Sequence, residues 1–173
     1  ILSYNKYKKF LPRNTNTMDL GPKFSNAQIL KEIKKHHLKY IKIRYPEKFI
    51  AKKLSEGLVV ACFQGRMEFG PRSLGNRSIL VSASDKSVNE WLNTKLKRTE
   101  FMPFAPITLK RFAKKMYKNL DKKKIASKFM TITTECTKQA IKISPAAVHI
   151  DNTARPQIIS NKDNKKINKI LNE

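Results

Sequence analysis

Residues 58–80 read Leu-Val-Val-Ala-Cys-Phe-Gln-Gly-Arg-Met-Glu-Phe-Gly-Pro-Arg-Ser-Leu-Gly-Asn-Arg-Ser-Ile-Leu. Six apolar residues in a row open this stretch, which is typical of a strand buried on both faces. The rest holds three of the five glycines and three of the eight arginines of the chain: Gly65, Gly70, Gly75, Arg66, Arg72 and Arg77. Glycine lets backbone N–H groups approach a ligand, and the arginine fork matches phosphate or carboxylate oxygens two at a time. The stretch therefore predicts a buried strand followed by an anion-binding loop.

Short polar and acidic side chains stand among these arginines. Asn76 and Ser78 supply hydrogen-bonding groups, and Glu68 either orients an arginine through a charge-assisted pair or contacts a ligand hydroxyl. Loops at strand ends are where open α/β sheets bind ligands. The glycine spacing fits neither the P-loop nor the dinucleotide-binding pattern. The alternative is a turn-rich surface loop whose arginines pair with acids.

Two further segments hold candidate binding residues. Arg98 precedes a stiff apolar stretch of prolines and phenylalanines at 101–106, which suits the wall of a pocket. His149 and Asp151 share one side of an extended segment by period-two spacing, and an imidazole near a carboxylate can act as an acid, a base or an oriented donor. The alternatives are that the phenylalanines are core and that His149 is a structural group. No nucleophile pattern accompanies the histidine, so no hydrolytic triad is predicted.

The charge of the chain marks no particular site. It has 173 residues, 37 of them basic and 13 acidic, and a formal net charge of +24, but the lysines are scattered. Non-specific binding of polyanions at low salt is expected from such a field. Two distant cysteines and no histidine at metal-ligand spacing argue against a disulfide framework and a metal site. Without a bilayer-spanning apolar run or a secretory signal, we expect a cytoplasmic protein with no membrane contact.

The pattern along the chain predicts an irregular lead-in over 1–24 and one α/β domain over 25–173. Ser25 is expected to cap a helix, and Pro46 to open a second helix that stops at Gly57. Further strands are predicted over 78–83, 104–109, 129–134 and 146–150, and further helices near Trp91, Phe112 and Ile167.

Three segments together resemble the carbamoyltransferase family, which includes nodulation-type and antibiotic O-carbamoyltransferases. They are residues 64–80, then Arg-Thr-Glu-Phe-Met-Pro-Phe-Ala-Pro at 98–106, then His-Ile-Asp-Asn-Thr-Ala-Arg-Pro-Gln at 149–157. The resemblance implies a C-terminal YrdC-like domain, a twisted mixed sheet flanked by helices, that makes carbamoyladenylate from ATP, with Mg²⁺, and carbamoyl phosphate. A separate N-terminal Kae1-like domain would transfer the carbamoyl group to an acceptor hydroxyl. The chain thus looks truncated at both ends.

The resemblance also implies residue roles. Catalytic roles fall to Arg72, Arg77 and His149. The substrate- and nucleotide-binding residues are Arg66, Glu68, Asn76, Ser78, Arg98, Asp151 and Arg155. Adenylation chiefly requires fixed positive charge around crowded oxygens, which arginines supply.

The sequence also departs from the family pattern. Ser73 stands in place of a usual alanine, Met102 in place of an arginine, and Asn152 in place of a frequent glycine. Asparagine is among the few residues that tolerate a left-handed turn. Two other functions stay open: a basic RNA-binding module of YrdC-like fold, and an inactive remnant with a stable fold.

Overall fold

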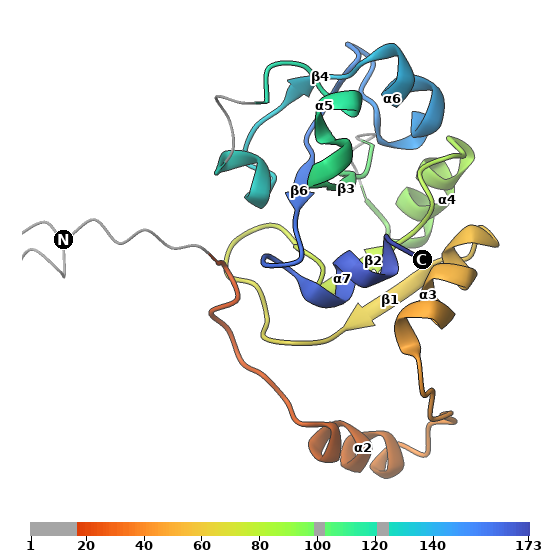
Figure 1. Ribbon diagram of the computed structural model, residues 1–173. Coiled ribbons are helices and arrows are strands. Elements are labelled where there is room, and N and C mark those ends of the chain that lie inside the picture. Colours follow the sequence, from red (N-terminus) through yellow and green to blue (C-terminus); the bar gives the residue numbers. More distant parts are fainter. Residues whose placement is uncertain (1–16, 99–102, 121–124) are drawn as a thin grey trace, which may run out of the picture.

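Helices and short strands alternate in the computed structural model, which describes residues 17–98, 103–120 and 125–173 (Figure 1). The strands of this part form three two-stranded sheets. Antiparallel β1 (Val60–Phe63) and β2 (Arg77–Leu80), parallel β3 (Ile107–Leu109) and β6 (Gln157–Ile159), and antiparallel β4 (Thr134–Glu135) and β5 (Thr153–Ala154) are the pairs. The predicted α/β class is confirmed, while the single twisted YrdC-like sheet stays a prediction.

The first two helices begin where their capping residues predict. In α2 (Asn26–Lys35) the backbone N–H of Gln28 donates to the Ser25 hydroxyl at 3.2 Å, and the Ser25 N–H donates to the Gln28 side chain at 2.8 Å. This reciprocal pair satisfies two N–H groups that a helix start leaves free. Pro46 opens α3 (Pro46–Ser55), which ends two residues before Gly57. Both predicted helices are confirmed.

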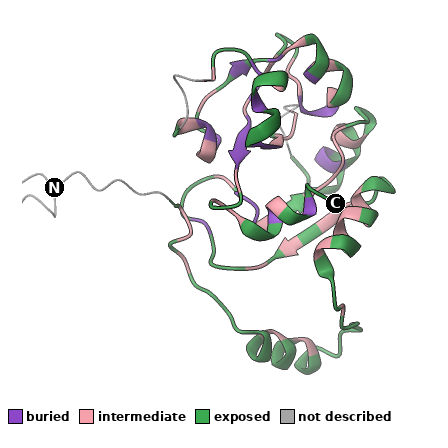
Figure 2. Cartoon of the chain, viewed as in Figure 1, coloured by how far each residue is buried: buried purple, intermediate pink, exposed green. Residues whose placement is uncertain are grey.

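The prediction that the first strand is buried on both faces is wrong. Side chains along β1 alternate between half-buried and exposed, and Phe63 is 57% exposed (Figure 2). Across the pair, Ala61 lies opposite Ile79, which is also exposed. A strand paired only with β2 in the described chain has one covered face, and the other meets solvent.

Two strands predicted in the second half are misplaced. Residues 146–150 are not a strand: Pro145–Ala147 form a 3₁₀ turn, and Asn152 has a left-handed φ of 61°. Within 129–134, Met130 also has a left-handed φ of 52°, so only Thr134 joins a strand. Proline and left-handed residues interrupt extended backbone, which the apolar composition alone did not reveal. The strands actually formed nearby are β5 and β6.

The other helices are short. The one predicted near Trp91 is α4 (Ser87–Lys95), the one near Phe112 is a 3₁₀ turn (Lys110–Phe112) leading into α5 (Ala113–Met116), and the last is α7 (Lys165–Ile170). A 3₁₀ turn (Ala126–Phe129) and α6 (Lys138–Ile143) complete the described elements. The predicted lead-in up to residue 16 and the 101–102 part of the apolar wall lie outside the described residues.

Strand β6 joins two hydrophobic clusters. Ile158 packs with Tyr117, Ala140 and Ala154, whereas Ile159 packs with residues of β3 and α7. Neighbouring residues of a strand point to opposite faces, so one buried strand serves both clusters. The second cluster also reaches α3 and β2. Through it, the β1–β2 hairpin and α7 are fixed against the same strand.

Gly75 provides a test of how tightly this region packs. Its φ is 110°, and an added Cβ would lie 2.7 Å from Cγ1 of Ile167. Gly70 has nearly the same φ, 109°, but open space around it. We expect Gly70→Ala to cost about 1–3 kcal/mol from backbone strain. Gly75→Ala should cost a further 1–3 kcal/mol or so, because the methyl group overpacks the core. Urea unfolding of both variants measures this, and equal losses would contradict it.

Candidate functional site

The loop between β1 and β2 is folded around the carboxylate of Glu68. Oε1 accepts hydrogen bonds from the backbone N–H groups of Leu74 and Asn76, both at 2.7 Å, and the N–H of Arg77 lies 3.2 Å from Oε2. Glu68 is only 7% exposed. A buried carboxylate is stable only when it is paired or hydrogen-bonded, and here backbone donors serve that need. The acid holds the second half of the loop against the first.

The electrostatics of Glu68 follow from these bonds. Burial alone would raise its pKa, but the N–H groups of Asn76, Leu74 and Arg77 lower it by more, and the pKa lies below its ordinary value. The carboxylate is therefore ionised at neutral pH. No ion pair joins it to an arginine within the described residues. Of the two roles expected for Glu68, arginine pairing is thus not observed, and ligand contact stays a prediction.

Asn76 connects the loop to two distant parts of the chain. Its Nδ2 donates to Oδ1 of Asp19 at 2.9 Å and to the backbone oxygen of Arg66 at 2.8 Å. Its Oδ1 accepts from Nδ2 of Asn164 at 3.2 Å. Close by, the Ser78 hydroxyl accepts from the backbone N–H of Gly75 at 2.9 Å. Both predicted polar residues of the loop are engaged with the protein itself.

Arg77 is also turned toward the loop. Its guanidinium donates to the backbone oxygens of Gln64 at 2.5 Å and Asn76 at 3.1 Å, and stacks on the Phe63 ring with 3.7 Å from Cζ to the centroid. Carbonyl acceptors and a cation–π contact both stabilise a guanidinium in a fixed position. Arg77 therefore ties the start of the loop to its end.

A surface cavity of about 270 Å³ opens beside this loop. Three cations and two acids are among its lining residues: Asp19, Gln64, Gly65, Arg66, Asn76, Asp163, Asn164, Lys165 and Lys166. The Asp163 carboxylate is already occupied, since it pairs with Lys128 at 2.7 Å and accepts from Ser160. Burial raises the pKa of Asp19, and this outweighs its hydrogen bonds and the attraction of Arg66. With three cations against two acids, one of which is paired with Lys128, the lining of the cavity carries net positive charge and favours anions.

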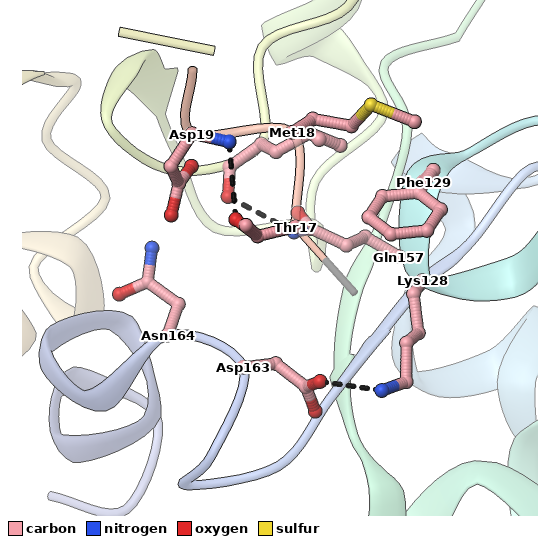
Figure 3. Close-up of a pocket in the computed structure, with 9 residues that line it drawn as sticks. Thr17, Met18, Asp19, Lys128, Phe129, Gln157, Asp163 and Asn164 are labelled. Carbon is pink, nitrogen blue, oxygen red and sulfur yellow. Dashed lines mark hydrogen bonds and ion pairs between the residues drawn. The ribbon is translucent and has the colours of Figure 1, made fainter. Parts of the chain in front are cut away.

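A second, smaller cavity of about 30 Å³ adjoins it and shares Asp19, Asp163 and Asn164 (Figure 3). Gln157 lines it, and Oε1 of that residue is buried with no partner in the described part of the chain. A polar space of this size is large enough for one water molecule. The Nε2 of the same side chain donates to the backbone oxygen of Leu74 at 2.9 Å. Gln157 thereby links β6 to the loop.

The predicted arginines do not all meet at the larger cavity. Arg66 lines it, while Arg77 faces the loop backbone as described. Arg72 and Arg155 are half-buried, and across residues 17–98, 103–120 and 125–173 neither has a hydrogen bond or ion pair. Arg98 is exposed and stacks on Phe104 with 4.9 Å from Cζ to the centroid. Of the three loop arginines Arg66, Arg72 and Arg77, Arg66 alone lines the larger cavity.

The His149 segment lies elsewhere. It joins β4 through the pairing with β5, and β4 and α6 stand at the end of the molecule opposite β1 (Figure 1). The segment is a turn rather than the extended run that the spacing predicted, because Asn152 adopts a left-handed φ. His149 and Asp151 still come together: Nδ1 of His149 lies 2.9 Å from the Thr153 hydroxyl, which donates to Asp151 at 2.7 Å.

Sequence reasoning missed five residues of the larger cavity: Asp19, Asp163, Asn164, Lys165 and Lys166. Asp19 lies within the predicted irregular lead-in, and the other four lie just before or at the start of the helix predicted near Ile167. Asp19 is 57 positions from Asn76, and Asn164 is 88 positions away. Nothing in the local pattern signals either contact. A capping asparagine before the last helix was the one available sign of ordered backbone there.

Two classes of site receive no support. No helix in the described residues could cross a membrane, and no group of three or more potential ligands among histidine, cysteine, aspartate and glutamate is found in that same part.

Replacing the buried acid tests its role in the loop. Glu68→Gln should lower the free energy of unfolding by about 1.5 kcal/mol at neutral pH, because charge-assisted bonds become neutral ones. The pKa of Glu68 is lowered in the folded chain. The parent should therefore be more stable than Glu68→Gln above pH 4.5, the ordinary pKa of a glutamate, and this difference in stability should disappear as the pH falls through the pKa of Glu68 in the folded chain. Urea unfolding across this range measures it. Glu90→Gln, at an exposed position of α4, is the control; an equal loss there would contradict the assignment.

Comparison with known proteins places the chain in a family. The carbamoyltransferase C-terminus family matches residues 51–173. An uncharacterized protein of Methanocaldococcus jannaschii is 37% identical over 87% of this chain and 25% of its own length. Nodulation protein NolNO of Sinorhizobium fredii is 32% identical over 69% of the chain and 18% of its own length. The 3'-hydroxymethylcephem-O-carbamoyltransferase of Streptomyces clavuligerus is 31% identical over 68% and 22%.

The chain spans a quarter or less of each of these three relatives. The matched region contains the whole loop around Glu68, α7 and the His149 turn, and lacks Asp19. On this match, the chain belongs to the carbamoyltransferase C-terminus family.

Proposed function

We propose that this chain is the substrate-activating domain of an O-carbamoyltransferase, which binds ATP and carbamoyl phosphate and forms carbamoyladenylate. The family match over 51–173 carries the proposal, because it includes the loop and the cations beside the larger cavity. Transfer to the acceptor hydroxyl is assigned to a Kae1-like domain in the rest of a longer protein. The name of the Streptomyces relative, 3'-hydroxymethylcephem-O-carbamoyltransferase, describes an activity of the same class.

The charges beside the larger cavity suit the phosphates of both substrates. Arg66, Lys165 and Lys166 line it, and one of its two acids is neutralised by Lys128. Phosphoryl chemistry depends mainly on positioning and on positive charge that is fixed before the substrate arrives. A rigid loop held by Glu68 and Arg77 provides such fixed geometry at Arg66. In this proposal Glu68, Asn76, Ser78 and Arg77 act by holding the loop.

Arg72 and Arg155 are the further candidates for substrate contact. Each is half-buried and lacks an anionic partner in the described residues. A partly desolvated cation without a partner is stabilised when an anion binds, so these side chains favour a ligand with several negative oxygens. Arg98 is placed with them only by the family resemblance. Mg²⁺ would arrive with ATP, since this ion is usually held by substrate phosphates together with one or two carboxylates.

Titration calorimetry with ATP and with carbamoyl phosphate tests this function on the 173-residue chain. Arg66→Ala and Arg72→Ala should each weaken binding about 10- to 100-fold, the effect of losing a charge-assisted contact worth about 1.5–3 kcal/mol. Arg44→Ala is the matched control, since Arg44 is exposed and stacks on Tyr45 away from the loop. Unchanged binding in both test variants would contradict the proposal.

A salt titration separates this function from general attraction to polyanions. RNA held by scattered lysines should dissociate steeply as salt rises, and the loop arginine variants should bind it as the parent does. Tight RNA binding that depends on Arg66 and Arg72, with no binding of ATP, would instead favour the nucleic-acid module.

A further inference from the structure

A tight turn holds His149 at the end of the molecule away from the larger cavity. The His149 N–H donates to the backbone oxygen of Thr153 at 2.8 Å, and the Asn152 N–H donates to that of His149 at 3.0 Å. The backbone oxygen of Asn152 accepts from the N–H of Cys136 at 2.8 Å, which fixes the turn to the residue that follows β4. The imidazole is therefore carried by ordered backbone.

The ionised carboxylate of Asp151 determines which groups donate and which accept in the side-chain hydrogen bonds of this turn. Oδ1 of Asp151 accepts from both the hydroxyl and the backbone N–H of Thr153, at 2.7 and 3.0 Å. The Thr153 hydroxyl bond is the chief cause of a lowered pKa of Asp151, so the carboxylate is ionised at neutral pH and can only accept. Thr153 has a single hydroxyl proton, which goes to Asp151.

The remaining contact then fixes the state of the imidazole. Since the Thr153 oxygen can only accept from Nδ1 of His149, at 2.9 Å, the proton of the neutral ring sits on Nδ1. Nε2 is left with a lone pair. This atom has no hydrogen-bond partner within the described residues, although the side chain is half-buried.

We propose that Asp151 and Thr153 are positioning residues that hold His149 in the Nδ1–H form, so that its Nε2 accepts a proton or hydrogen bond from an N–H or O–H group of a ligand. The site is distinct from the larger cavity and goes beyond the function proposed above. It stands or falls independently of phosphate binding.

Nitrogen NMR of the 173-residue chain tests the tautomer directly. In alkaline solution the ¹⁵N resonance of His149 Nε2 should lie at the downfield position of an unprotonated nitrogen, and that of Nδ1 at the upfield position of an N–H. Thr153→Val removes the hydroxyl at nearly constant volume and should move the proton toward Nε2, the form that unconstrained histidine favours. Thr153→Ser keeps the hydroxyl and should retain the parent pattern.

Acylation by diethyl pyrocarbonate, read out by mass spectrometry for each histidine, tests whether Nε2 is available. His149 should react in the parent and more slowly in Thr153→Val, while His36 and His37, exposed near the end of α2, react equally in both. A parent His149 protonated on Nε2, or one that resists acylation while the other two react, would overturn the proposal without requiring any variant to fold. Arg66→Ala should leave the tautomer unchanged, which separates this site from the phosphate site.

Discussion

The buried carboxylate of Glu68 is the constraint on which the rest of the site depends. Three backbone N–H groups from the far side of the loop converge on it, and bonds to a charged acceptor are stronger than bonds to a neutral one. Fixing Asn76 through its backbone leaves the side chain of that residue free to reach Asp19 and Asn164. One acid in a strongly basic chain therefore assembles three segments that are remote in sequence.

The scaffold around the loop explains how a domain with short strands keeps this geometry. β6 is buried along its whole length and sends consecutive isoleucines into two clusters. The Gln157 side chain of the same strand donates to the loop at Leu74, and Ile167 of α7 packs where Gly75 leaves room. Packing therefore sets the position of the loop, while its polar bonds set its internal shape. The positions of the cations beside the larger cavity therefore depend on both the packing and these polar bonds.

The sequence predicts the features that depend on local chemistry better than those that depend on tertiary contacts. Helix starts are local chemistry, so Ser25 and Pro46 located α2 and α3 correctly. Strands of two or three residues have too little pattern to be found, and Pro145 and Asn152 replaced an expected strand with turns. The loop was recognised, but its glutamate was expected to pair with an arginine or to contact a ligand hydroxyl, since residue types do not reveal that backbone donors are nearer. Asp19 and Asn164 depend on tertiary contacts alone.

Amide hydrogen exchange measured by NMR tests the central claim most directly, because each N–H reports its own bond. If one carboxylate holds the loop, the amides of Leu74 and Asn76 share an acceptor and should be strongly protected, exchanging at similar rates through a common opening. The amide of Gly70, at an exposed part of the same loop, should exchange far faster. Exchange of Leu74 and Asn76 as rapid as that of Gly70 would contradict the account.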